Sequence, residues 1–204
     1  MIQLPALQRF VVPRRAETTG ELCELCGGEV PASHRHVVDL ERQALQCVCH
    51  ACAILFDRTS SSTGRFRTVP DRITMDKNLA MTSSEWSALG VPVGLAFVFH
   101  STRLGRPVLC YPGPAGVTEA EAPPGVWEAL LAASPAAATL EPDVEALLIR
   151  GERGAPHLQS FVIPIDAAYA LAGRLRVCWR GFTGGDEAQR ELDAFFAEIT
   201  ERAR

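Results

Sequence analysis

The chain has 204 residues, of which 47% are hydrophobic and 22% charged, so it can bury a real core and lacks the composition of a disordered protein. Its net charge of −4 gives no electrostatic preference for nucleic acid or for an anionic membrane. No stretch approaches the roughly 18–20 apolar residues that cross a bilayer, and the first residues lack the pattern of a signal peptide. We therefore expect a cytoplasmic protein that neither binds nucleic acid nor inserts into a membrane.

Composition and turn signals divide the chain into four segments. Residues 1–20 form an extended lead-in with three arginines and two prolines, and residues 21–58 hold five of the seven cysteines. Residues 59–80 begin with a polar run and form a connector. Residues 81–204 carry alternating helix and strand patterns, which predict one compact α+β domain.

Two Cys-x-x-Cys motifs mark the ends of the second segment, at Cys23–Cys26 and Cys49–Cys52. Two residues between the thiols let one tight turn aim both sulfurs at one point, and Gly27 lets the chain leave the first turn with a positive φ. Two such turns at the ends of a hairpin supply four thiolates in a tetrahedron, as in structural zinc sites. We predict a Zn²⁺ site formed by Cys23, Cys26, Cys49 and Cys52 in a zinc-ribbon-like module that depends on the metal to fold.

The identity of the metal and one ligand stay open at this point. Rubredoxin holds iron with two similar turns, although Ala53 stands where its second turn has a glycine. Cys47 competes with Cys49 as a ligand, but Cys49 fits the Cys-x-x-Cys turn better. His34 and His36 share a face of a predicted strand, which makes His36 a reserve ligand. Such a histidine pair is more often a solvated or hydrogen-bonded strand face.

The fourth segment predicts helices and strands in a definite order. They are a helix with a capping box at Thr82 and Glu85, a hairpin over residues 93–111, a rigid loop over Tyr111–Glu121, a helix over 126–133, strands over 144–149 and 158–163, and two helices capped by Asp166 and Asp186. We expect the helices to gather toward one side of a small, mainly antiparallel sheet. Asp143 and Glu145 alternate along one strand and are interpreted as a solvated face.

The sequence favours a protein without catalytic activity, and an active site within residues 81–204 stays open as a weaker alternative. The chain shows no nucleophile–base pair, phosphate-binding loop or dinucleotide fingerprint. A tetrathiolate site also leaves its metal no open position for a substrate. We predict instead a protein-binding module, whose docking surface consists of the hairpin with His34, Arg35 and His36 and of the Tyr111–Glu121 loop.

Short stretches over nearly the whole chain carry a resemblance to one family. They are Arg14–Glu17, Cys23–Cys26, His34–His36, Cys49–Phe56, Val93–Phe97, Tyr111–Gly116, Pro142–Leu148, Val162–Asp166 and Trp179–Phe182. In these stretches the chain resembles an uncharacterised domain-of-unknown-function family of high-GC Gram-positive bacteria. Such proteins are often encoded beside the subunits and maturation proteins of high-affinity uptake nickel–iron hydrogenases.

The resemblance implies a role in that context. It points to a non-catalytic zinc-binding accessory or assembly protein that docks onto a metalloenzyme complex, with hydrogenase subunits or maturation factors as partners. The alternative is a rubredoxin-like iron electron carrier for the same redox system. The last helix departs from the family pattern, because Ala188 and Gln189 occupy a region where the family often has a tryptophan.

Overall fold

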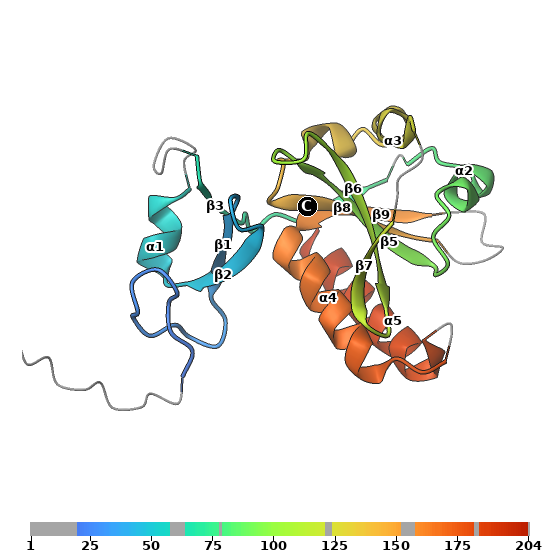
Figure 1. Ribbon diagram of the computed structural model, residues 1–204. Helices are drawn as coiled ribbons and strands as arrows, with labels where there is room; N and C mark the ends of the chain where they lie inside the picture. The colour runs from blue at the N-terminus through green and yellow to red at the C-terminus, as the bar shows by residue number, and fades with distance from the viewer. Residues whose placement is uncertain are drawn as a thin grey trace, which may run out of the picture.

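The computed structural model describes residues 20–57, 64–77, 79–120, 124–151, 158–181 and 184–203. The predicted lead-in before residue 20, the polar run up to residue 63 and Glu121 lie outside these ranges. Two antiparallel sheets and several helices make up the fold, which confirms the predicted α+β class (Figure 1). A three-stranded sheet has the order β2-β1-β3, and a six-stranded sheet has the order β4-β9-β8-β5-β6-β7.

The small sheet belongs to the cysteine module and has a different core on each face. Its elements are β1 (Arg35–Asp39), β2 (Ala44–Val48), α1 (His50–Leu55) and β3 (Phe66–Thr68). Val37 packs with Val48 and two of the cysteines, whereas its neighbour Val38 packs into the core of the large sheet. Because successive side chains of a strand point to opposite faces, β1 joins the two cores.

The large sheet and its helices account for the rest of the described chain. The strands are β4 (Thr74–Asp76), β5 (Leu95–Ser101), β6 (Arg106–Gly113), β7 (Gly116–Ala120), β8 (Glu145–Arg150) and β9 (Gln159–Pro164). The helices are α2 (Ser83–Ala88), α3 (Val126–Ala133), the 3₁₀ turn η2 (Ala137–Thr139), α4 (Ile165–Cys178) and α5 (Gly185–Arg202). Within the described ranges, none of the helices has both the length and the apolarity to span a bilayer.

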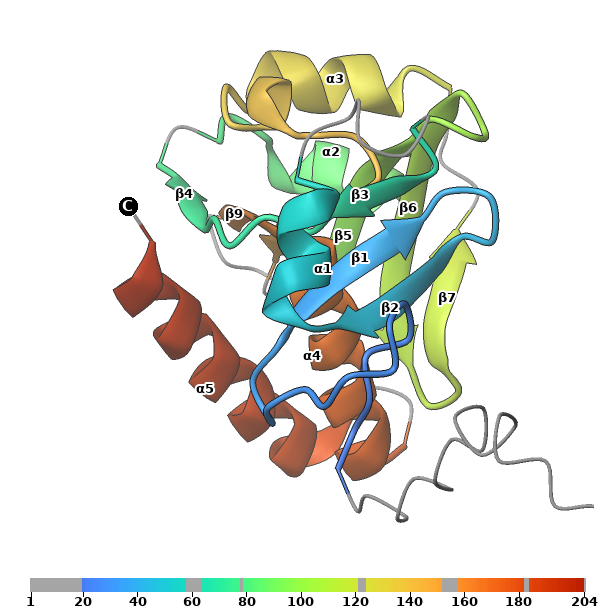
Figure 2. The same ribbon diagram turned by 90° about the vertical axis from the view of Figure 1, so that its left-hand side faces the viewer.

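Helices cover both faces of the large sheet, so the expectation that they gather on one side is wrong. Phe97 and Leu148 pack with α4 and α5, whereas Val98 and Leu147 pack on the other side with Leu130 of α3. Apolar residues at successive positions of β5 and β8 make both faces of these strands hydrophobic, and each face needs a cover. Figures 1 and 2 both show α3 on one side of the strands and α4 with α5 on the other.

The stretch predicted as a rigid loop, Tyr111–Glu121, is largely a β-hairpin. β6 continues to Gly113, β7 starts at Gly116, and these two glycines pair across a two-residue turn. Gly116 has φ of 111°, a value that favours glycine. The glycine and proline content that predicts a loop here serves a tight turn instead.

Local predictions for helix starts have mixed outcomes. The capping box at the start of α2 is confirmed, because the Thr82 hydroxyl accepts from the Glu85 N–H and the Glu85 carboxylate accepts from the Thr82 N–H. Asp166 and Asp186, however, lie within the first turns of α4 and α5 and do not cap them. Both carboxylates still lie near the positive end of a helix dipole, where negative charge is favourable.

Asp143 and Glu145 are buried, so their interpretation as a solvated strand face is wrong. The Asp143 carboxylate accepts from the backbone N–H and the hydroxyl of Thr102 at 2.9 and 2.7 Å. The Glu145 side chain is 0% exposed and accepts from Nε of Arg72 at 2.8 Å. Arg72 lies between β3 and β4, so this ion pair fastens the link between the two sheets.

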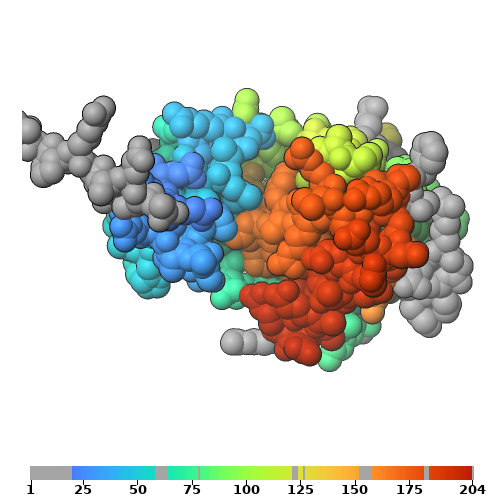
Figure 3. All heavy atoms as spheres, turned by 90° about the horizontal axis from the view of Figure 1, so that it is seen from below, coloured from blue at the N-terminus to red at the C-terminus, as the bar shows by residue number. Residues whose placement is uncertain are grey.

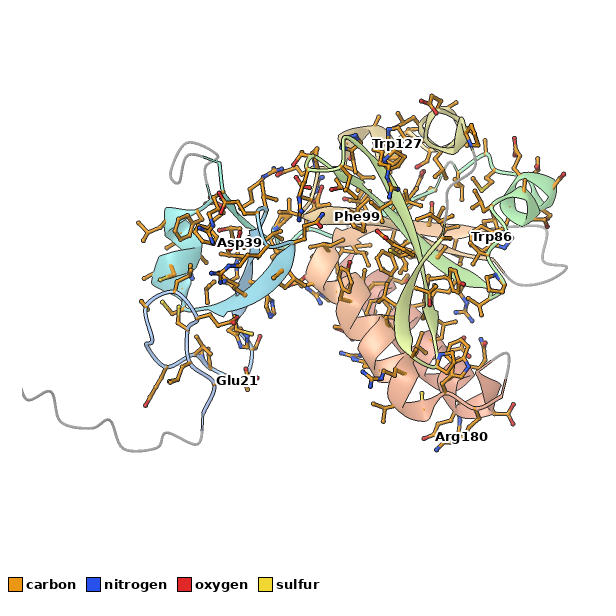
Figure 4. All side chains as sticks on the ribbon, in the orientation of Figure 1. Glu21, Asp39, Trp86, Phe99, Trp127 and Arg180 are labelled. Atoms are coloured by element: carbon orange, nitrogen blue, oxygen red, sulfur yellow. The ribbon has the colours of Figure 1, made fainter. Side chains whose placement is uncertain are left out.

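The small sheet contacts the large domain through both polar and apolar groups. Nη1 of Arg67 on β3 donates to the Pro142 carbonyl at 2.6 Å, and Nδ1 of His36 on β1 lies 2.8 Å from Oδ2 of Asp166. A hollow of about 600 Å³ remains between the sheets, and its lining includes Val38 and Phe99. Figure 4 shows Phe99 on the part of the large domain nearest the small sheet, and Figure 3 shows the N-terminal module beside α4.

A buried carboxylate, that of Asp39, lies at the end of β1 where the chain turns into β2. The Asp39 side chain accepts from the backbone N–H groups of Glu41 and Arg42, which stabilises the turn between β1 and β2. It also pairs with Nη2 of Arg65 at 2.7 Å, and this guanidinium holds the pKa of Asp39 below its ordinary value. A depressed pKa means that the stabilisation is present at neutral pH and is lost as the pH falls through the folded-state pKa.

We expect Glu145→Gln to destabilise the domain strongly. Breaking a buried pair costs about 3–5 kcal/mol, and we expect about 3 kcal/mol because Arg72 is 42% exposed and keeps part of its hydration. Urea unfolding of the metal-saturated protein measures this loss. The control is Glu191→Gln, which removes a surface pair with Arg174 and should cost less than about 1 kcal/mol. Equal losses for the two variants would contradict this role for the buried pair.

Candidate metal centre

The four cysteines of the two Cys-x-x-Cys motifs meet at one place. The sulfurs of Cys23, Cys26, Cys49 and Cys52 all lie within 4.8 Å of one another. The sulfurs of Cys26 and Cys49 are 3.7 Å apart. A tetrahedron with metal–sulfur bonds of about 2.3 Å has edges of about 3.8 Å, so this separation fits one ion at the centre.

The first turn is fixed by its own backbone. The Gly27 N–H donates to the Cys23 carbonyl at 2.7 Å, and the Cys23 N–H donates to the Gly28 carbonyl at the same distance. Gly27 has φ of 70°, the positive value expected for the residue that follows this turn. Leu22 and Glu29 then form a bridge that closes the loop around both thiols. The sequence therefore aims Cys23 and Cys26 through local geometry alone.

The second turn uses the start of a helix. Cys49 precedes α1 in an extended conformation and Cys52 lies in the first turn of α1. The Ala53 N–H donates to the Cys49 carbonyl at 3.0 Å. An extended residue followed by one helical turn thus places both sulfurs on the same side of the backbone.

Cys47 contributes its backbone to this centre. The Cys47 N–H donates to Oε2 of Glu24 at 2.6 Å, and the Cys47 carbonyl accepts from the Glu24 N–H at 2.9 Å. These two bonds fasten the first turn to β2 and bring Cys26 beside Cys49. The Cys47 sulfur does not belong to the four-cysteine group, and lies instead with His34 and His36.

The electrostatics of the four sulfurs favour a bound cation. Burial alone raises the pKa of Cys23, but N–H groups of Cys49, Cys26 and Leu25 donate to its sulfur and lower the pKa to about 6. Burial raises the pKa of Cys52, as do the neighbouring cysteine sulfurs. One thiolate therefore forms readily, and further negative charge needs compensation. A divalent ion would supply it, and protein sulfurs would then fill all four positions around the ion.

The predicted docking hairpin looks different in the structure. The His34 side chain is only 8% exposed, and its Nδ1 lies 2.9 Å from the Pro31 carbonyl oxygen. His34 is therefore not displayed to a partner as predicted. The carboxylate of Asp166 beside His36 was missed at the sequence level. No local signal pairs these two residues, because 130 positions separate them.

We expect the loss of any one of the four thiols to remove the tetrathiolate ion. Thiolate-to-Co²⁺ charge-transfer bands of the cobalt-loaded protein measure this centre. In the Cys23→Ser, Cys26→Ser, Cys49→Ser and Cys52→Ser variants the bands of the tetrathiolate ion should be lost, because we expect that ion to supply most of the folding free energy of its module. Cys47→Ser and Cys178→Ser should keep the bands, since neither sulfur belongs to the group. Bands that survive Cys49→Ser and vanish in Cys47→Ser would contradict this ligand set.

Comparison with known proteins identifies a family and no close relative. Among curated proteins and among solved structures, nothing matches this chain. One family model matches residues 22–203, a range that includes all four cysteines of the centre and both sheets. The chain therefore belongs to a family of unknown function, DUF5947.

Proposed function

We propose that this protein is a zinc-stabilised module that binds another protein and has no catalytic centre at its four cysteines. Four protein thiolates fill every position of a tetrahedral ion and leave none for a substrate or an activated water. Such an ion stabilises the fold around it. The backbone turns that aim the sulfurs support this interpretation, because they fix the module in one conformation.

The observation that carries the proposal is an exposed apolar pair beside the centre. Ile54 and Leu55 of α1 are each 60% exposed, and only Ala53 separates them from Cys52. Figure 1 shows α1 on the side of the small sheet away from the large one. Binding to a preordered surface costs little conformational entropy, and a metal-fixed helix presents its side chains in this way.

The partner we propose is a protein with a complementary apolar groove. By the family resemblance, it is a subunit of an uptake nickel–iron hydrogenase or one of its maturation factors. A docked partner would remove Ile54 and Leu55 from water, and two large aliphatic side chains offer several kcal/mol of hydrophobic stabilisation when fully buried. The protein would then act as an accessory or assembly factor of that complex.

A second candidate is an iron-containing electron carrier, and the position of Cys26 favours it. Cys26 is exposed whereas Cys23 and Cys52 are buried, so one edge of the centre reaches the surface. An iron ion in this site would supply one-electron chemistry. A ferric tetrathiolate site is red, whereas zinc is colourless because its d shell is full. We expect protein purified from the native host to be colourless.

We expect Ile54→Ser combined with Leu55→Ser to weaken binding to purified hydrogenase subunits or maturation proteins at least tenfold. Tenfold corresponds to about 1.4 kcal/mol, less than a hot-spot residue typically contributes. Isothermal titration calorimetry measures the Kd. Val177→Ser is the matched control, because Val177 is an 80% exposed aliphatic residue on α4. An unchanged Kd in the double variant, or an equal loss in Val177→Ser, would contradict the proposed surface.

A further inference from the structure

Three potential metal ligands converge on the face of the small sheet opposite the four cysteines. His36 of β1 pairs directly with Cys47 of β2, and His34 lies two residues before His36. Side chains directly opposite each other, and those two positions apart on one strand, share a face of a sheet. Val38 shares this face and packs toward the large domain, whereas Val37 packs with the cysteine centre.

The distances among the three side chains suit one ion. One ring nitrogen of each histidine and the Cys47 sulfur lie within 4.8 Å of one another. The two imidazole rings have their centroids 4.9 Å apart. An ion bonded at about 2.1 Å to each nitrogen and at about 2.3 Å to the sulfur fits between them after small rotations of the side chains.

Hydrogen bonds decide which nitrogen of each ring faces an ion. Nδ1 of His34 lies 2.9 Å from the Pro31 carbonyl oxygen, and Nδ1 of His36 lies 2.8 Å from Oδ2 of Asp166. A carbonyl and a carboxylate accept hydrogen bonds, so both Nδ1 atoms carry the proton that they donate. In a neutral ring, Nε2 then keeps its lone pair. Metal-binding histidines are commonly held in this way by a carboxylate or a backbone carbonyl.

The Nε2 atom of His34 gives independent support for a cation at this place. This atom is buried and has no hydrogen-bond partner among the described residues. The His34 side chain as a whole is only 8% exposed. A buried polar atom without a partner is unfavourable, and native structures rarely leave one. A cation bound to the lone pair of Nε2 would satisfy it.

We propose that His34, His36 and Cys47 form a second metal site for a divalent ion of the Zn²⁺ class. Two imidazoles and one thiolate suit Zn²⁺, which accepts both nitrogen and sulfur ligands. This site is separate from the four-cysteine centre, and it does not depend on the docking function proposed above. It differs from that centre in kind, because three protein ligands leave a fourth position for water or a small ligand.

A hollow in the surface makes the site accessible to a metal ion, and a neighbouring carboxylate orients one of its ligands. Both histidines line a hollow of about 390 Å³ between the small sheet and the helices α4 and α5. Asp166, at the start of α4, lines the same hollow and orients the His36 ring. His36 and Cys47 lie in the small sheet and His34 directly precedes β1, whereas the large domain supplies this positioning carboxylate. An ion here would therefore stabilise the contact between the two parts of the protein.

Metal counting on the full chain tests the proposal. The apo-protein is titrated with Zn²⁺ against a chromophoric chelator, and bound zinc is then counted by mass spectrometry. We expect two ions per chain in the wild type. His34→Ala, His36→Ala and Cys47→Ser should each bind one ion and keep the Co²⁺ bands of the tetrathiolate centre. His50→Ala is the matched control, because His50 is exposed in the same module, and it should bind two ions.

Asp166→Asn tests the positioning residue separately. It should keep two ions at saturation and weaken the second one about 10–100-fold, as the loss of an outer-sphere partner does. A merely structural role of Asp166 would lower the melting temperature without changing the affinity for the second ion. X-ray absorption of the wild type with two zinc ions should also show imidazole scattering. This measurement needs no variant, so it does not depend on whether the variants fold.

Either of two results would overturn the second site. One is a wild type that binds a single zinc ion at micromolar free metal. The other is a second ion that shows no imidazole scattering or that survives in His36→Ala. A failure of the hydrogenase-binding experiment would leave these results unaffected, since the zinc count needs no partner protein.

Discussion

Four cysteine sulfurs within 4.8 Å of one another repel as thiolates unless a cation lies among them, and the cysteine module is built around this constraint. Its own buried core is small, because apart from the cysteines it consists of Val30, Val37, Val48 and Ala53. A core of this size does not stabilise a segment of this length unless a disulfide or a bound metal ion supports it. The backbone turns at Gly27 and Cys49 bring the four sulfurs together, and a bound cation would supply the attraction that holds them there.

Strand β1 connects the cysteine module to the rest of the protein, because its two faces belong to different cores. Val37 on one face depends on the cysteine core, whereas Val38 on the other face belongs to the core of the large sheet. The ion pair of Arg72 with Glu145 and the contact of His36 with Asp166 add polar ties between the same two parts. The large sheet has its own apolar cores on both faces and needs no thiolate to close them. We therefore expect the cysteine module to depend on a metal ion and the large sheet to depend on hydrophobic burial.

Local patterns predicted from the sequence agree with the structure where the interaction is short in range. The two Cys-x-x-Cys turns, the capping box at Thr82 and the hairpin of β5 with β6 depend on residues close together in the chain. Long-range contacts could not be predicted from local patterns. No local signal places His36 beside Asp166 or buries Glu145 against Arg72, because these partners are far apart in the sequence. The hairpin at Gly113 and Gly116 was predicted as a loop, because the same residues favour loops and tight turns.

Hydrogen exchange of the full chain with and without a zinc chelator tests most directly whether the metal holds the cysteine module. The account predicts that amides over residues 21–57 lose protection when the metal is removed. Amides of β5, β8 and β9 should keep most of theirs, because their cores contain none of the four cysteines of the centre. Unchanged protection over residues 21–57 after complete metal removal would contradict the account, since the module would then be stable without an ion.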